Sequence, residues 1–239
     1  AATGPVTGPV TGPVTGPVTV AELPEYDIPP KHGPRILVAV KHVGELGDDF
    51  AIAEDGLSIA DEHFEYALNE WDDAALEQAL LLSEKIDGEV VAVTIGPEAA
   101  EDTLRKVLAK GAQRAVRVWD DSLAGADPIT VARALAGVAR REEADLILTG
   151  VQSSDLAQGA TGTALARILG LPHAAVVLDA QWDGGATLTA TRELEGGMRH
   201  RFELPAPALL TIQTGGHTPR YATMRMIKQA KQKTIAVLD

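Results

Sequence analysis

Four short apolar runs, each followed by a segment of helical periodicity, constrain the fold more than any other feature of this 239-residue chain. An apolar run without alternation is typical of a strand that is buried on both faces of a parallel sheet. Apolar residues that recur every three or four positions are typical of a helix packed on such a sheet. The predicted strands are residues 36–40, 90–93, 115–119 and 145–149; the predicted helices are residues 72–86 and 98–110, one opened by Asp127 and Pro128, and one through Leu165, Ile168 and Leu169 that ends at Gly170.

Each connection between these strands is long enough for a right-handed crossover, so we expect one parallel sheet with helices on both faces. The pattern then changes, because Asp183-Gly184-Gly185 and Glu195-Gly196-Gly197 are turn signals of antiparallel hairpins. Residues 209–214 and 234–238 are further predicted strands, and residues 222–231 a helix. The predicted fold class is therefore α/β, a doubly wound parallel sheet with a small antiparallel extension and a C-terminal helix.

The first 34 residues have a different composition from the rest. Residues 3–18 repeat the sequence TGPV, and residues 23–34 are rich in proline. Glycine and proline break helices and weaken strands, so we expect residues 1–34 to form an extended tail or linker. Two interpretations stay open, an arm that lies on a partner subunit and a tail without a role. The predicted nucleotide-binding domain is residues 35–239.

Charge and composition exclude several function classes. The net charge of −13 argues against nucleic acid and against an anionic membrane surface, since both need a basic face. The chain has no cysteine, which excludes disulfides, thiolate catalysis and Cys-ligated metals. We find neither an apolar run of membrane-spanning length nor a secretory signal, so the expected location is the cytoplasm and no membrane insertion is expected.

The carboxyl ends of the predicted strands indicate where a ligand would bind, because parallel sheets bind ligands at that edge. Two loops end there, one at Lys41-His42-Val43 and one over residues 150–163. The second contains Gly150, Gly159 and Gly162, which would allow backbone N–H groups to approach a phosphate at a helix N-terminus. Spacing alone leaves two interpretations open, a phosphate cradle and a turn required only for packing.

Known catalytic patterns are absent from the sequence. There is no P-loop, no complete Gly-x-Gly-x-x-Gly fingerprint and no Gly-x-Ser-x-Gly elbow, so Ser153 and Ser154 are poor candidates for a nucleophile. The six histidines are scattered without the spacing of a metal site. The acidic pairs Asp72-Asp73 and Asp120-Asp121 are expected to cap helices or to face water. The sequence therefore favours a binder or carrier over a self-sufficient catalyst.

Basic residues cluster near the C-terminus of this acidic chain. Two interpretations apply, a solvated helix face and an electrostatic landing site for an acidic protein partner. The cluster consists of Arg220, Arg225, Lys228, Lys231 and Lys233.

Several of these segments together resemble the β subunits of electron-transfer flavoproteins. The run from Ile36 to Lys41 resembles their first strand, and Asn69-Glu70-Trp71-Asp72 resembles the turn before their first helix. Gly96-Pro97 fits the same pattern, and Pro219-Arg220-Tyr221-Ala222-Thr223 resembles a C-terminal signature of the family. The resemblance runs from about Arg35 to the end of the chain, and the order of the motifs is more specific than any one of them.

The resemblance implies an adenine-nucleotide hydrolase-like parallel sheet that binds AMP, with FAD mainly on an α subunit at the heterodimer interface. It implies an electron carrier between acyl-CoA or other dehydrogenases and a membrane quinone oxidoreductase, as in fatty acid beta-oxidation. Trp71 stands at the aromatic position that approaches the flavin in relatives. The implied cofactor-binding residues are Ala39, Asn69, Trp71, Asp72, Ile95, Gly150, Gln152, Asp155, Gln158, Gly159, Thr161, Gly162 and Thr163, and the implied partner-binding residues are Arg220, Tyr221, Met224 and Lys228.

Three alternatives remain. An electron-bifurcating flavoprotein would bind a second FAD in this subunit, but its Asp-Gly-Asp-Thr-type phosphate loop is replaced here by Asp155-Leu156-Ala157-Gln158, which favours AMP. A stand-alone adenine-nucleotide-binding stress protein could have a similar fold. A nucleotide-activating enzyme of this fold would need a Ser-Gly-Gly-type loop after the first strand, which is missing.

Overall fold

The computed structural model describes residues 26–47, 50–53, 55–57, 59 and 63–238. Its centre is a sheet of seven parallel strands in the order β12-β5-β4-β1-β6-β11-β7, which confirms the predicted α/β class. β1 lies in the middle, and the chain adds β4 and β5 on one side before it crosses to β6 on the other. The strands are β1 (Arg35–Ala39), β4 (Glu89–Ile95), β5 (Arg114–Val118), β6 (Leu146–Gly150), β7 (His173–Val177), β11 (Ala208–Ile212) and β12 (Ile235–Leu238).

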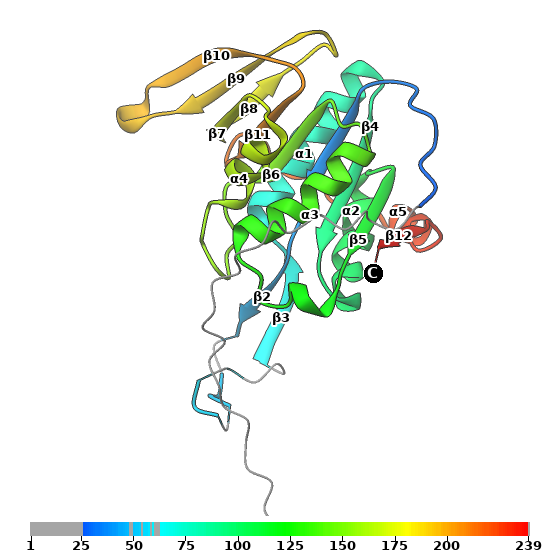
Figure 1. Ribbon diagram of the computed structural model, residues 1–239, viewed down its shortest axis with the longest axis vertical. Helices are drawn as coiled ribbons and strands as arrows, with labels where there is room; N and C mark the ends of the chain where they lie inside the picture. Colours follow the sequence, from blue (N-terminus) through cyan, green and yellow to red (C-terminus); the bar gives the residue numbers. More distant parts are fainter. Residues whose placement is uncertain (1–25, 48–49, 54, 58, 60–62, 239) are drawn as a thin grey trace, which may run out of the picture.

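Helices cover both faces of this sheet, as doubly wound topology requires (Figure 1). Side chains alternate along β1, so that Ile36 and Val38 face one helix layer while Leu37 faces the other. One layer contains α1 and α2, with α5 beside α2, and the other contains α3 and α4. The helices are α1 (Glu70–Ile86), α2 (Glu101–Lys110), α3 (Pro128–Arg141), α4 (Thr161–Leu169) and α5 (Met224–Ala230).

The predicted helix ends agree with the structure where a capping residue marks them. The Asp127 side chain accepts hydrogen bonds from the backbone N–H groups of Ile129 and Thr130 at the start of α3. Gly170 adopts the left-handed conformation after α4, which glycine adopts without strain. No helix in the described part of the chain is long and apolar enough to span a membrane.

Two antiparallel elements accompany the main sheet. The predicted extension is a three-stranded sheet of β8 (Asp179–Gln181), β9 (Thr187–Glu193) and β10 (Arg199–Pro205), with turns at the two predicted Gly-Gly pairs. A second element, the hairpin of β2 (His42–Leu46) and β3 (Phe64–Leu68), was not predicted, and neither was β7 at the edge of the main sheet. The hairpin strands flank a segment after β1 for which the sequence predicts no regular element.

The amino-terminal edge of the sheet contains a closed ring of four charged side chains. Arg35 binds Glu89 at 2.7 Å and Glu142 at 3.3 Å, and Arg114 binds the same two carboxylates. Arg35 and Glu142 are almost completely buried, at 2% and 0% side-chain exposure. The two arginines and two glutamates carry no net charge, which lowers the cost of burying them.

Residues 26–34, the part of the predicted tail that the structure describes, run without helix or strand and contact this ring. The Tyr26 hydroxyl donates a 2.6 Å hydrogen bond to Glu142, and Lys31 forms an ion pair with Asp145. Burial and the Glu142 carboxylate raise the pKa of Tyr26, which keeps the phenol a donor. The TGPV repeats lie outside the described residues.

Candidate functional site

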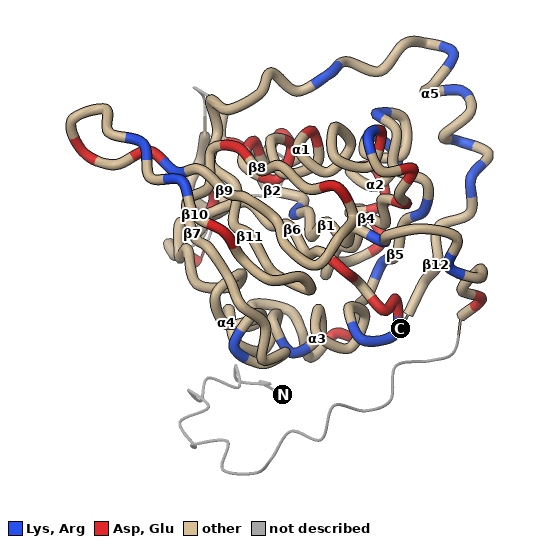
Figure 2. Tube along the Cα trace, turned by 90° about the horizontal axis from the view of Figure 1, so that it is seen from above, with Lys and Arg blue, Asp and Glu red and all other residues tan. Residues whose placement is uncertain are grey.

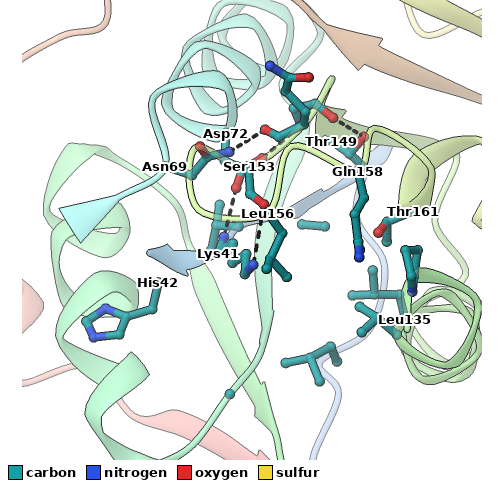
Figure 3. A pocket seen from close by; sticks show the side chains of 18 of the residues that line it. Lys41, His42, Asn69, Asp72, Leu135, Thr149, Ser153, Leu156, Gln158 and Thr161 are labelled. Atoms are coloured by element: carbon teal, nitrogen blue, oxygen red, sulfur yellow. Dashed lines mark hydrogen bonds between the residues drawn. The ribbon is translucent and has the colours of Figure 1, made fainter. Parts of the chain in front are cut away.

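A cavity of about 340 Å³ opens at the carboxyl ends of β1, β4 and β6, beside the point where the strand order reverses (Figure 3). Its size lies within the range of small-molecule sites. One wall is apolar and comes from β1, β4 and α3; the other is polar and comes from the start of α1 and from the loop between β6 and α4. The apolar wall includes Ala39, Ile95, Val131 and Leu135, and the polar wall includes Asn69, Asp72, Gln152, Ser153, Gln158 and Thr161.

Asp72 joins the two central strands at the floor of this cavity. Its carboxylate accepts hydrogen bonds from the backbone N–H of Lys41, just past β1, at 2.8 Å and from that of Gly150, at the end of β6, at 2.9 Å. The residue is buried, so the expectation that it caps a helix or faces water is wrong. Burial raises the pKa of Asp72 to about 7, although hydrogen bonds from Asn69, Lys41 and Gly150 lower it.

The stability of the protein should therefore depend on pH through Asp72. In the unfolded chain this carboxyl ionises near pH 4, whereas in the folded protein it stays neutral until about pH 7. The stability that its neutral form provides is complete below about pH 4 and is lost as the pH rises through about 7. We expect the free energy of unfolding, relative to Asp72→Asn, to fall by about 4 kcal/mol over this interval.

Urea denaturation of both proteins at several values between pH 4 and pH 8 measures this dependence. Asp183→Asn, in an exposed turn, is the matched control for the loss of a carboxylate. A constant difference between wild type and Asp72→Asn would mean that Asp72 is ionised throughout.

Asn69 holds the loop between β6 and α4 against the start of α1. Its side-chain amide donates to the Gln152 carbonyl at 2.8 Å and accepts from the Ser154 N–H at 3.2 Å. The Asn69 backbone N–H also donates to the carbonyl of Lys41. Because one side chain satisfies two backbone groups of the loop, the loop has a defined conformation on this side of the cavity.

The N-terminus of α4 closes the polar wall. Ala160 at the N-cap position offers no side-chain acceptor, so backbone N–H groups of the first turn remain available to a ligand. A Cβ atom at Gly162 would lie 2.6 Å from both Thr149 Oγ1 and Thr211 Cγ2. Only glycine therefore allows α4 to lie this close to β6 and β11. An open helix N-terminus of this kind binds phosphate groups.

Two titratable side chains that follow β1 line the cavity. The Lys41 ammonium group binds Asp155 at 2.7 Å and lies 3.3 Å from Ser153 Oγ. The His42 ring stacks on Tyr66 at 4.7 Å between centroids. Burial and the nearby Lys106 charge lower the pKa of His42, which favours the neutral ring. No cluster of potential metal ligands occurs among the residues described.

The structure brings most of the predicted cofactor residues into one cavity, although their binding role stays a prediction. Trp71 is half-buried beside Gly150, the exposed Asp155 pairs with Lys41, and the Thr163 hydroxyl donates to the Ala160 carbonyl. These three do not line the cavity. The predicted residues that do are Ala39, Asn69, Asp72, Ile95, Gly150, Gln152, Gln158, Gly159, Thr161 and Gly162.

Sequence reasoning missed the wall that α3 contributes. Pro128, Val131 and Leu135 line the cavity, together with Trp119 directly after β5. A signal for this wall was present, because Asp127 and Pro128 mark a helix start directly after a predicted parallel strand. Helices that start at that edge of a sheet point their first turns towards the ligand crevice.

Basic positions recur along the chain at α5 (Figure 2), and the C-terminal segment there contains the predicted partner-binding residues. Tyr221 and Met224 are 91% and 72% exposed, and Lys228 is also exposed. Arg220 differs from these, because its guanidinium binds Glu77 at 2.9 Å and Glu84 on α1. Arg220 therefore anchors the segment to α1, and partner binding by all four residues stays a prediction.

The chain is similar in sequence to one protein family and to named members of it. A family model described as "Electron transfer flavoprotein domain" matches residues 56–239. The chain is 50% identical over 204 residues to a protein of Methylophilus methylotrophus, covering 84% of this chain and 77% of the relative. It is 34% identical over 208 residues to a human protein, covering 85% of this chain and 80% of the relative. Both relatives are named electron transfer flavoprotein subunit beta.

Proposed function

The chain belongs to the family of electron-transfer flavoprotein β subunits, and from this premise we propose that it binds AMP within a heterodimer that carries electrons from dehydrogenases to a membrane quinone oxidoreductase. The role of an electron-transfer flavoprotein β subunit follows from the family, and such a subunit implies an α-subunit partner. The proposal goes further than the family in four points: the bound AMP, the electron donor, the electron acceptor and the direction of electron flow. The cytoplasmic location stays a prediction.

The observation that most directly supports nucleotide binding is the open N-terminus of α4. It lies at the polar end of a cavity whose other wall is apolar. Adenine would pack against the apolar wall, which includes Ile95, Val131 and Leu135. The phosphate would lie at the first turn of α4, within reach of the Thr161 hydroxyl and of backbone N–H groups. An apolar slot with a few convergent polar groups is the usual form of a nucleotide site.

The polar wall suits one phosphate better than the pyrophosphate of a second FAD. Ala157 and Gln158 stand where a bifurcating flavoprotein would have the second Asp and the Thr of its phosphate loop. The Leu156 side chain lines the cavity and offers no hydrogen-bond donor. Among the residues described, Lys41 is the only lysine or arginine in the lining, and Asp155 pairs with it. These features favour AMP over a second FAD.

The redox cofactor would lie at the interface with the α subunit, where FAD supplies the capacity to accept and release electrons. The contribution of this chain would be to bind and orient its partners. Trp71, half-buried in the first turn of α1, is the proposed neighbour of the flavin. The exposed Met224 is the proposed apolar anchor for a dehydrogenase, since methionine adapts to varied surfaces.

We expect the chain to co-purify with an α subunit as a yellow heterodimer that contains equal amounts of AMP and FAD. Acid extraction followed by chromatography against nucleotide standards measures both. The extraction separates the proposal from its alternatives, because a bifurcating protein would release FAD without AMP. A colourless homodimer that retained ATP would instead indicate a stand-alone nucleotide-binding protein and contradict the proposal.

A further inference from the structure

Lys41, which lines the cavity, forms an ion pair with Asp155. Lys41 is the only lysine or arginine that lines the cavity in the described part of the chain, and its side chain is 38% exposed. Its ammonium group lies 2.7 Å from one Asp155 oxygen, 2.8 Å from the other and 3.3 Å from Ser153 Oγ. Figure 3 shows Lys41 and Ser153 side by side at the cavity, on segments far apart in sequence.

Asp155 is ionised at neutral pH and is not part of the cavity lining; its side chain is 27% exposed. Burial alone would raise its pKa, but hydrogen bonds from Lys41 and Ser153 hold the pKa below its usual value. The positive charge of Lys41 is therefore balanced before a ligand binds. The remaining attraction for an anion comes from the N-terminus of α4, which acts as a fraction of one charge.

A nucleotide phosphate brings more negative charge with each added phosphoryl group. The partial charge of one helix N-terminus suits a single phosphate, whereas two or three phosphates usually require free lysine or arginine side chains or a metal ion. The buried carboxyl group of Asp72 adds no positive charge to the cavity. The lining of the cavity is therefore matched to a ligand with little negative charge.

We propose that the Lys41–Asp155 pair determines phosphate number, so that the cavity accepts nucleoside monophosphates and rejects nucleotides with a di- or triphosphate. The pair neutralises Lys41, the one lysine or arginine of the lining among the residues that the structure describes. Release of Lys41 from Asp155 would allow its ammonium group to bind a second phosphate. This inference rests on the proposed nucleotide function and concerns the same cavity.

Asp155→Asn in the complete heterodimer tests the proposal. The purified complex is incubated with equal concentrations of AMP, ADP and ATP in the presence of a chelator, freed of unbound nucleotide, and extracted. We expect wild type to retain mainly AMP. Asp155→Asn should raise the ratio of bound ADP to bound AMP about tenfold, the size expected when a lysine gains a charge-assisted bond to phosphate.

Two further variants separate the ion pair from a general change in charge. Glu98→Gln removes an exposed carboxylate between Pro97 and the buried Ala100, close to the cavity rim, and should leave the ratio unchanged. Lys41→Gln leaves Asp155 unbalanced, so it should lower the ratio below that of wild type. This second substitution keeps the proposal testable if Asp155→Asn does not fold.

The possible failures are distinguishable. If wild type retains AMP and Asp155→Asn leaves the ratio unchanged, the proposal about phosphate number is wrong while the AMP function stands. The same holds if Glu98→Gln produces an equal increase. If wild type retains no adenine nucleotide at all, both the proposed function and this inference are overturned.

Discussion

Replacing Gly150 by alanine should abolish nucleotide retention and lower the free energy of unfolding by about 3 kcal/mol. A Cβ atom at this position would lie 2.4 Å from Asp72 Oδ1 and 2.7 Å from Trp71 Cβ. Neither distance is compatible with ordinary packing, so the first turn of α1 would have to move away from β6. That movement would break the hydrogen bond between the Gly150 N–H and Asp72.

The atoms around Gly150 cannot easily move to make room for a Cβ atom. The backbone carbonyl carbon of Trp71 would also lie 2.9 Å from the new atom, and backbone moves only with the whole helical turn. α1 packs on β1, β6 and β11, so its displacement disturbs the centre of the core. The cavity would lose its shape because Asn69 and Asp72, which hold its polar wall, stand at the start of the same helix.

Urea denaturation and extraction of bound nucleotide measure the two effects separately. Gly47→Ala is the matched control, since a Cβ there meets nothing within 4 Å and the residue is exposed. The control should change neither quantity. Retention of AMP by Gly150→Ala at wild-type stability would show that the contact between α1 and β6 is looser than described.

The main sheet is predictable from the sequence because its strands are buried on both faces. The runs at residues 36–40 and 90–93 contain only apolar residues, and each lies beside a helix with its own apolar face. β7 and the β2–β3 hairpin are not predictable in this way. The strand β7 begins with the exposed His173 and has only two buried residues, Ala174 and Val177. A long connection rather than a short turn joins β2 to β3. The order of the strands depends on contacts that no local pattern encodes.

Some features of the candidate site are also predictable from local sequence, whereas others depend on contacts between distant segments. Its glycines and their position near a helix N-terminus follow from local sequence, and the resemblance to relatives supplies Asn69 and Asp72. The burial of Asp72 cannot be predicted from local sequence, because two adjacent acidic residues in a first helical turn usually face water. Its carboxylate is buried only because two backbone N–H groups, from distant strands, converge on it. The wall from α3 likewise depends on how the crossover packs.

Replacing Arg35 by methionine should lower the free energy of unfolding by about 3–5 kcal/mol, the usual cost of leaving a buried charge without its partner. Arg35 binds Glu89 and the fully buried Glu142, so its loss gives the ring a net negative charge. Arg114 would remain as the single cation for two carboxylates. The folded fraction should still retain nucleotide, because Arg35 begins β1 and the cavity lies at the opposite end of that strand.

A double variant tests whether the balance of charge, rather than arginine packing, is responsible. Adding Glu142→Gln to Arg35→Met restores neutrality, so the double variant should be more stable than the sum of the two single losses predicts, by about 1–3 kcal/mol. Lys31→Met removes the ion pair with Asp145, which is about one-third exposed, and should cost about 1 kcal/mol or less. If Arg35→Met costs no more than this control in urea denaturation, the ring does not stabilise the amino-terminal edge of the sheet. Additive losses in the double variant would instead assign the cost to packing of the Arg35 side chain.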